Sequence, residues 1–535
     1  MRQGHSARVV SKAGWGATRK VGAIVLAFLW GVTLAGGCVA QTALPALVLP
    51  DPAPAPPMTV FLPVPDPRVE QALASLDDLA EDIRRRSDIP GLAVAVVHRG
   101  QTVYAKGFGT RQVGADQPVD ADTVFLLASV SKPIGASVVA RLVDAGVTAW
   151  DMPVQQSLPW FDLGDPWISR HVTVGDLYAH RSGLPDHAGD DLEDIGYDRR
   201  QVLERLHLLP QRAFRNHYAY TNFGLTAAAE AVAAAADSDW ASLSQSVLYD
   251  PLGMTRTSSR HADYLARDNR ARPHMAGAQG YIPTDQRQPD AQSPAGGVSS
   301  SAADMARWMA MVLRADGALT DAITPQKVTG KPMAVAARPG IYGYGFNVGT
   351  RATGRVVISH SGGFALGAST NVSLIPDLDL GIVVLTNAPP VGAAEAIAAS
   401  FLDRAEIGTD SRDWLAAYQP FMAPLSAPFL HLAAEGPPKD PTPAGPATRY
   451  VGRYENAYFG AATVAQTDDG LILRLGPAGL EWPMQHWDGD SFAVRPLSEN
   501  EPPGSVSLVR FRDDGATLWI EHLDHYGWGS FGATD

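Results

Sequence analysis

A serine and a lysine lie three residues apart where an apolar run meets a helix-like pattern. Ser129 ends the run, and Lys132 follows at helical spacing, one turn along the same face of a helix. Pro133 suits a helix here only in the first turn, where its missing N–H does no harm. A serine hydroxyl becomes a nucleophile when a base takes its proton, and a lysine in a dry site can be that base. The pair predicts an activated serine, although a capping serine beside a solvated lysine has the same pattern.

Two later motifs strengthen the catalytic interpretation. Tyr220-x-Asn222 precedes an alanine-rich helical stretch, and His360-Ser361-Gly362-Gly363 follows a strand pattern. Each motif is weak alone, since Tyr454-Glu455-Asn456 repeats the first and a His-Ser-Gly sequence is often a turn. Ser-x-x-Lys occurs only at Ser129. The ordered set of three motifs therefore indicates an active serine.

The elements expected around these motifs mix helices and strands. We expect a helix over residues 69–86, a strand hairpin over 92–98 and 102–108, and a helix from Ser129 to near Gly146. Further strands are expected over 344–348, 356–359, 370–375 and 381–385, then a helix over 392–402. Between Gly146 and Leu313 the pattern is helical, with a long polar loop before Gly296. The acidic cluster Asp186, Asp190, Asp191, Glu193 and Asp194 is expected to be a solvated loop, or alternatively one wall of a cleft.

In this order, the three motifs resemble those of the serine β-lactamase and penicillin-binding protein superfamily. The resemblance is nearest to the class C branch and the related esterases and peptidases, and covers about residues 69–402. Supporting signatures are Thr123-Val124-Phe125, His180-Arg181-Ser182-Gly183-Leu184, Pro251-Leu252-Gly253-Met254, Gly296-Gly297-Val298 with Asp304, and Leu385-Thr386-Asn387. The resemblance implies an α+β fold: an antiparallel sheet flanked by helices, with an all-helical subdomain.

The resemblance also implies a role for each motif residue. Ser129 would attack a carbonyl and be acylated, while Lys132 and Tyr220 would share the proton transfers. Which of those two is the base stays open. The backbone N–H groups of Ser129 and Gly363 would form an oxyanion hole. The residues implied to bind substrate or the oxyanion are Asn222, His360, Ser361, Gly362 and Gly363.

The third motif departs from the β-lactamase pattern. Many β-lactamases carry Lys-Thr-Gly or Lys-Ser-Gly there, and this chain has neither sequence. A histidine at position 360 holds a carboxylate less firmly than a lysine. We therefore expect a serine hydrolase that acts through an acyl-enzyme on a small ester or D-amino-acid-type amide. The alternatives are a class C-like β-lactamase and a non-catalytic penicillin-binding sensor.

The net charge of the chain and its N-terminal segment indicate which partners are unsuitable and where the protein is expected to be located. A net charge of −13 over 535 residues argues against nucleic acid and against docking on anionic lipid. A basic start and the apolar stretch 21–34 resemble an export signal. Cleavage before Gln41, lipidation of Cys38 in Ala35-Gly36-Gly37-Cys38, or an uncleaved anchor are the alternatives. We expect an exported protein, periplasmic or tethered to the membrane through Cys38.

The chain divides into five parts. We expect a signal over 1–40, a proline-rich linker over 41–67, a hydrolase domain over 68–403, a second linker over 404–447, and a small barrel-like β domain over 448–535. The β domain is expected to narrow access to the active site. His522 and His525 are read as surface residues rather than metal ligands. No metal or organic cofactor is expected, the partner is a small-molecule or peptide substrate, and the oligomeric state stays open.

Overall fold

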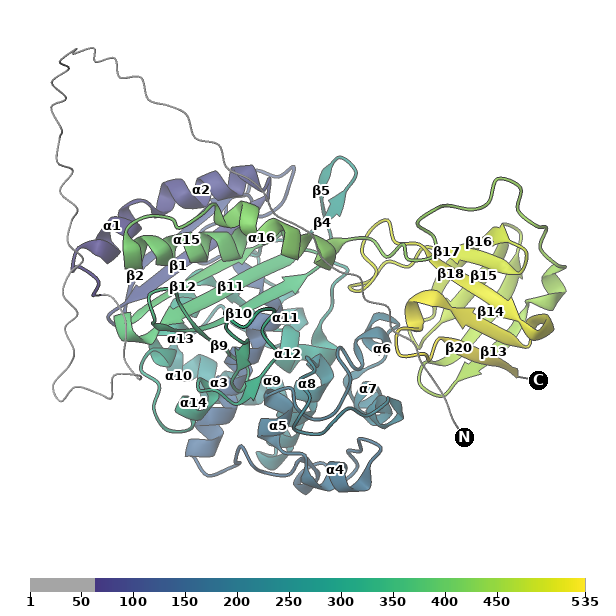
Figure 1. Cartoon of the computed structure of the whole chain (residues 1–535), viewed down its shortest axis with the longest axis horizontal. Helices are drawn as coiled ribbons and strands as arrows, with labels where there is room; N and C mark the ends of the chain where they lie inside the picture. The colour runs from purple at the N-terminus through teal and green to yellow at the C-terminus, as the bar shows by residue number, and fades with distance from the viewer. Residues whose placement is uncertain (1–62, 535) are drawn as a thin grey trace, which may run out of the picture. The chain divides into compact units, whose positions relative to one another are not determined.

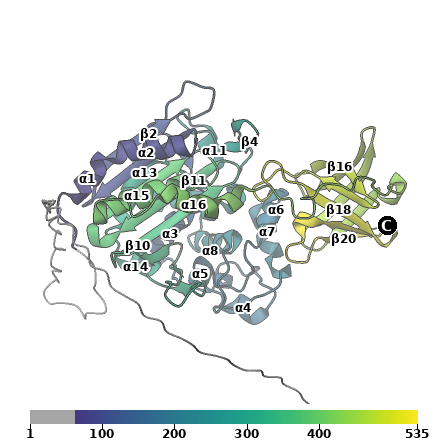
Figure 2. The same ribbon diagram turned by 45° about the horizontal axis from the view of Figure 1, so that its top comes forward.

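A computed structural model describes residues 63–534. The predicted signal, Cys38 and most of the first linker lie outside the described residues. The largest element is an antiparallel sheet of eight strands in the order β2-β1-β12-β11-β10-β9-β8-β7 (Figures 1 and 2). The strands are β1 (Gly91–His98), β2 (Gln101–Gly109), β7 (Lys327–Val328), β8 (Ile341–Tyr342), β9 (Asn347–Thr350), β10 (Val356–Phe364), β11 (Ala368–Ile375) and β12 (Leu380–Thr386). The predicted hairpin β1–β2 is confirmed, and the strands expected over 370–375 and 381–385 pair with each other as β11 and β12.

The central strands are apolar on both faces because helices cover both. In β1, Val94 and Val96 face one core while Ala93, Ala95 and Val97 face the other, as expected from the two-residue period of a strand. Fully burying one such aliphatic side chain stabilises the fold by about 1.5–3 kcal/mol. The unbroken apolar run in the sequence thus reflects burial on both sides.

Helices form a layer on each face of the sheet. One layer contains α1 (Arg68–Ala74), α2 (Leu76–Arg86), α15 (Ala393–Ile407) and α16 (Trp414–Met422). The other contains α13 (Ala302–Val312), which packs on β1 and β12, and α3 (Ser131–Asp144) beyond it. The predicted single helix over 69–86 is broken at Ser75, whose hydroxyl donates to the Ala72 carbonyl at 2.9 Å. Such local bonding competes with helix continuation.

The helical subdomain lies between α3 and α13 in the sequence. Its helices are α4 (Pro166–His171), α5 (Val174–Tyr178), α6 (Asp190–Asp194), α7 (Arg199–Arg205), α8 (Asn222–Ala235), α9 (Trp240–Ser244), α10 (Asp250–Leu252), α11 (His261–Leu265) and α12 (Ser293–Gly296), with α14 (Gly317–Ala322) after α13. The stretch expected to be a polar loop also holds the hairpin β4 (His274–Gly277) and β5 (Gly280–Pro283). The segment therefore carries a small sheet besides its helices.

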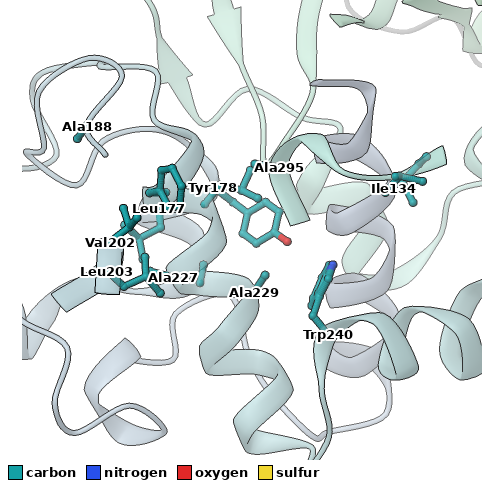
Figure 3. Packing of buried hydrophobic residues seen from close by; sticks show 14 of the residues in the cluster. Ile134, Leu177, Tyr178, Ala188, Val202, Leu203, Ala227, Ala229, Trp240 and Ala295 are labelled. Atoms are coloured by element: carbon teal, nitrogen blue, oxygen red, sulfur yellow. The ribbon is translucent and has the colours of Figure 1, made fainter. Parts of the chain in front are cut away.

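A dense apolar core fixes this subdomain behind the catalytic motifs. In Figure 3 the Tyr178 ring lies among Ala229, Trp240 and Ala295. The short helix α12 packs against both α3 and α8. Because α3 carries Lys132 and α8 begins at Asn222, this packing sets the distance between the first two motifs.

The C-terminal part is a closed barrel of eight antiparallel strands. Its strands are β13 (Gly452–Asn456), β14 (Gly460–Thr467), β15 (Gly470–Leu475), β16 (Leu480–Asp488), β17 (Ser491–Val494), β18 (Ser507–Arg512), β19 (Thr517–Ile520) and β20 (Ser530–Thr534). The predicted barrel-like domain is confirmed. The second Tyr-x-Asn copy, Tyr454-Glu455-Asn456, lies in β13 with Tyr454 buried in the barrel. Among the helices of residues 63–534, none is both long and apolar enough to cross a membrane.

Candidate active site

Ser129 lies in a tight turn between a short strand and α3. Strand β3 (Val124–Leu126) pairs with β6 (Ser299–Ser301), and a turn of 3₁₀ helix, Ala128–Val130, leads into α3. Ala128 is buried with φ +46°, a conformation that is uncommon for a residue with a side chain. The carbonyl of Leu127 accepts a hydrogen bond from Thr370 at 2.7 Å. Ser129, the predicted nucleophile, thus lies directly before the start of α3, where the sequence predicts it.

Lys132 reaches back to Ser129 from the first turn of α3. Its Nζ lies 3.1 Å from Ser129 Oγ, 2.6 Å from Asn222 Oδ1 and 3.0 Å from the Ala295 carbonyl. Asn222 Nδ2 donates to Asp190 Oδ2 at 2.9 Å, which orients the amide with Oδ1 toward the lysine. Both Oδ1 and the Ala295 carbonyl can only accept. A neutral lysine therefore gives its two N–H groups to them and turns its lone pair toward the Ser129 hydroxyl.

Burial makes the neutral lysine accessible near neutral pH. The side chain of Lys132 is fully buried, and loss of hydration lowers its pKa to about 7, against a smaller opposing effect of the Asp190 charge. Burial raises the pKa of Tyr220 far above its ordinary value, and the Ser129 contact offsets only part of this rise. Tyr220 is therefore a neutral phenol at neutral pH. Lys132 Nζ lies 4.5 Å from the centre of its ring.

The second motif is held by the signature that begins at His180. The His180 carbonyl accepts from the Ala219 N–H at 3.0 Å, and His180 Nδ1 accepts from the Thr221 N–H at 3.1 Å. The His180 and Tyr220 rings are 4.5 Å apart. Burial lowers the pKa of His180 well below its ordinary value, so its Nδ1 is free to accept. This histidine is thereby a positioning residue for Tyr220 and Asn222.

The third motif passes directly beside the nucleophile on β10. A Cβ atom at Gly362 would lie 2.8 Å from the Ser129 nitrogen and 2.4 Å from the Leu127 carbonyl oxygen. Only glycine leaves room for this approach. Gly363 and Ser129 both line the same pocket, where the two backbone N–H groups implied by the resemblance would be placed.

His360 and Ser361 make protein contacts of their own. His360 Nδ1 donates to the Ser361 carbonyl at 2.6 Å, and Nε2 accepts from the Tyr342 hydroxyl at 2.9 Å. Burial lowers the pKa of His360 to about 3, so the ring is neutral. Ser361 Oγ accepts from Asn371 on β11 at 3.1 Å. Neither side chain is among those lining the pocket, whereas Asn222 and Gly363 are.

The pocket at Ser129 has a volume of about 290 Å³ and is lined in part by acidic residues. The lining residues that sequence reasoning did not assign to the site are His187, Asp190, Glu193, Asp194, Arg287, Gln292, Phe364, Ala365, Pro390, Leu425, Glu499 and Asn500. Three of them belong to the acidic cluster, which was expected to be solvated. Instead Asp190 and Asp191 are buried. Helix α6 forms one wall of the cleft, which was the alternative prediction for this cluster. The density of acidic residues in that stretch was the available signal.

The barrel contacts the hydrolase part beside this pocket. Glu499, in the loop between β17 and β18, accepts from the Ala365 N–H at 2.6 Å. The prediction that both histidines are surface residues is wrong for His522, which is buried and bonds with Ser507, whereas the partly exposed His525 pairs with Asp191 at 3.1 Å. Neither histidine belongs to a cluster able to hold a metal within residues 63–534. His522 thus contributes a hydrogen bond inside the barrel, whereas His525 links the barrel to α6 of the hydrolase part.

The sequence profile described as beta-lactamase matches residues 76–405. The chain belongs to the beta-lactamase family. It is a serine hydrolase of this family. A second profile, a domain of unknown function named DUF3471, matches residues 436–516.

Similar proteins include hydrolases of several kinds. An unguisins hydrolase of Aspergillus campestris is 27% identical over 418 residues, which are 71% of this chain and 75% of the relative. The D-alanyl-D-alanine-carboxypeptidase/endopeptidase AmpH of Escherichia coli is 26% identical over 47% of this chain and 65% of its own. The octameric penicillin-binding protein homologue from Pyrococcus abyssi superposes with a TM-score of 0.55 at 19% identity, over 84% of this chain and 98% of its own. The last comparison concerns the fold alone.

Proposed function

We propose that this beta-lactamase family member is exported and hydrolyses a small ester or a D-amino-acid-type amide through an acyl-enzyme. The observation that carries the proposal is the contact between Ser129 Oγ, which lines the pocket, and Nζ of the fully buried Lys132. In the proposed first step, Lys132 takes the hydroxyl proton while Oγ bonds to the substrate carbonyl carbon. The carbonyl oxygen becomes an oxyanion that the N–H groups of Ser129 and Gly363 stabilise.

The remaining steps return the proton and release the acid. The Lys132 ammonium, directly or through the Tyr220 hydroxyl, protonates the leaving alcohol or amine as its bond to carbon breaks. Water then attacks the acyl-enzyme, and the proton it loses restores the Ser129 hydroxyl. Lys132 is the proposed base because its pKa lies near 7 while that of Tyr220 is strongly raised. Tyr220 serves as the proton relay.

His360 favours esters and peptides over β-lactams. The ring is neutral and engaged with Tyr342, so position 360 supplies no cation to hold a β-lactam carboxylate. Glu499 and Asn500 of the barrel loop line the pocket, which supports a role of the barrel in narrowing access. Replacing Asn500 by glycine should raise kcat/KM for a bulky ester more than for a butyrate ester. An equal effect on both esters would count against such narrowing.

The proposed function is tested with two chromogenic substrates. Hydrolysis of p-nitrophenyl butyrate and of a chromogenic cephalosporin is measured for the parent and for Ser129→Ala. We expect ester turnover, little cephalosporin turnover and an inactive variant. Efficient cephalosporin turnover would instead identify a β-lactamase. Stable labelling by a penicillin without turnover of either substrate would indicate a sensor, and an active Ser129→Ala protein would refute the nucleophile.

A further inference from the structure

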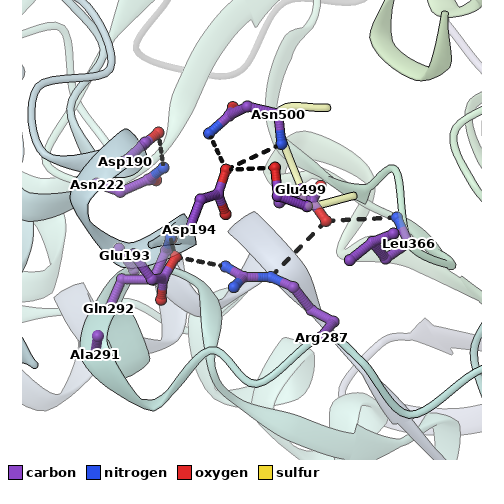
Figure 4. Close-up of polar contacts among 12 residues, drawn as sticks. Asp190, Glu193, Asp194, Asn222, Arg287, Ala291, Gln292, Leu366, Glu499 and Asn500 are labelled. Atoms are coloured by element: carbon purple, nitrogen blue, oxygen red, sulfur yellow. Dashed lines mark hydrogen bonds and ion pairs between the residues drawn. The ribbon is translucent and has the colours of Figure 1, made fainter. Parts of the chain in front are cut away.

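Carboxylates outnumber cations along the substrate pocket. Asp190, Glu193 and Asp194 come from α6, and Glu499 comes from the barrel loop (Figure 4). The cationic side chains lining the same pocket are Arg287 and His187. These four carboxylates form a surface that we call the acidic wall.

The cations present do not neutralise the acidic wall. Arg287 is shared between two of its members, lying 2.9 Å from Glu193 and 3.8 Å from Glu499. Asp194 accepts hydrogen bonds from neutral donors of the barrel loop, at 3.0 Å from Ser498 and 2.7 Å from the Asn500 amide. Figure 4 shows the single guanidinium among these carboxylates. His187 Nδ1 lies 2.9 Å from Asp190, so the four carboxylates share two cationic side chains.

Two carboxylate oxygens of the acidic wall lack a donor. Oδ1 of Asp190 and Oε1 of Glu193 are buried and have no hydrogen-bond partner among the described residues. Their side chains are only 9% and 7% exposed, and both residues line the pocket. A buried acceptor without a donor is costly and rare in folded proteins. A ligand that brings N–H donors would relieve this deficit.

Burial and crowding also affect the protonation of the acidic wall. Burial raises the pKa of Glu499 to about 8 and that of Asp194 to about 7, although Arg287 opposes both shifts. Near neutral pH these two carboxyl groups therefore hold part of their protons, and the acidic wall is not fully ionised. A bound cation would keep these groups ionised by supplying the missing positive charge.

The opposite assignment, an anion on Arg287, fits less well. The guanidinium is already paired with Glu193 and lies 4.4 Å from the centre of the Phe364 ring. An incoming carboxylate would have to displace Glu193 while facing the other members of the acidic wall. Like charges in a poorly solvated site repel strongly.

We propose that the acidic wall binds an ammonium group of the substrate, so that the preferred esters or amides carry a free amino group. This inference rests on the proposed function, because it assigns a substrate class to the same pocket. It also gives the barrel a part in specificity, since Glu499 belongs to the barrel loop. The acidic wall would recognise a primary ammonium group, and other residues of the pocket would contact the rest of the substrate.

The test uses three probes of nearly equal shape. Benzylammonium, benzyl alcohol and benzoate are each measured as inhibitors of the neutral substrate p-nitrophenyl butyrate, with the full chain near neutral pH. Because charge-assisted hydrogen bonds are stronger than neutral ones, we expect benzylammonium to inhibit competitively, with a constant on the order of tenfold lower than that of the alcohol. Equal inhibition by amine and alcohol overturns the inference. Tightest inhibition by benzoate also overturns it and assigns the pocket to anions through Arg287.

A variant pair separates this site from general charge effects. Glu499→Gln should weaken benzylammonium about three- to tenfold and leave benzyl alcohol unchanged. Glu435→Gln, at an exposed position in the linker, is the matched control and should change neither constant. Benzylammonium binding that is insensitive to Glu499→Gln refutes the role of the barrel glutamate in the acidic wall.

Failure of the proposed function is recognised separately. If p-nitrophenyl butyrate is not hydrolysed, the proposed function fails, and binding of the same three probes is measured by calorimetry on the full chain. If the ester is hydrolysed and the amine has no advantage, only the inference about the acidic wall fails.

Discussion

Replacing Asp190 by asparagine should move the pH profile of ester hydrolysis toward acid. The Asp190 charge raises the pKa of Lys132, while burial lowers it to about 7. The two groups are joined through the Asn222 amide by contacts of 2.6 Å and 2.9 Å, and the amide O–N separation of about 2.2 Å places the charges no more than about 8 Å apart. Asparagine keeps an oxygen that can accept from Asn222. The substitution therefore removes the charge with little change in shape.

The expected shift follows from Coulomb's law. At about 8 Å and an effective dielectric constant of about 20, the charges attract by about 2 kcal/mol, which corresponds to between one and two pKa units. Solvent in the open pocket weakens this attraction, so we expect a shift of about one unit. The variant should be half-maximal near pH 6 where the parent is half-maximal near pH 7. At pH 6 it should thus keep about five times the parent's fraction of plateau activity.

The assay is kcat/KM for p-nitrophenyl butyrate between about pH 5 and pH 9, followed at the isosbestic wavelength of p-nitrophenol. Activity should rise with pH because the neutral form of Lys132 is the proposed base. A rise that continues beyond pH 9 in the parent would instead identify the Tyr220 phenolate. His187→Gln is the control, because Asp190 raises the pKa of His187 to about 9, and loss of the rise in this variant would assign it to His187. An unmoved or alkaline-shifted rise in Asp190→Asn refutes the reasoning.

Three further substitutions test the frame of the site. Gly362→Ala should lower kcat by about 100-fold or more, because a Cβ would press on the nucleophile's backbone nitrogen; near-parent activity contradicts the close approach. Asp176→Asn should lower the free energy of unfolding by about 2 kcal/mol in urea titrations, since hydrogen bonds from Arg215 and Arg181 outweigh burial and lower the pKa of this carboxyl. The difference should shrink in acid, because the contribution is complete above the ordinary pKa of 3.8 and is lost as pH falls through the lowered folded value. His360→Gln should keep ester kcat/KM within about fivefold, as expected for a neutral ring; a 100-fold loss would indicate a cationic role.

Local patterns in the sequence determined the elements and the motif residues. Ser129 and Lys132 meet at 3.1 Å because helical spacing alone brings residues three apart onto one face. The unbroken apolar run of β1 predicted a buried strand, and alternating runs predicted five of the eight barrel strands, all but β13, β16 and β20. The break at Ser75 was missed because the apolar period continues through it. Strand β16 was missed because Pro483 interrupts its apolar run, and only Met484 of the strand is buried.

Tertiary structure alone decided the electrostatics of the site. The pKa of Lys132 falls because distant segments, including the Ala295 carbonyl and the Tyr220 ring, exclude water from its amine. The acidic wall combines carboxylates of α6 with Glu499 of the barrel loop, far apart in sequence, and Arg287 pairs with members of both groups. Periodicity reports which face of an element is buried, whereas a pKa depends on every charge and every water that the folded chain brings near or excludes. For that reason the sequence predicted a nucleophile and a base, while only the folded chain showed that the pocket at Ser129 is acidic.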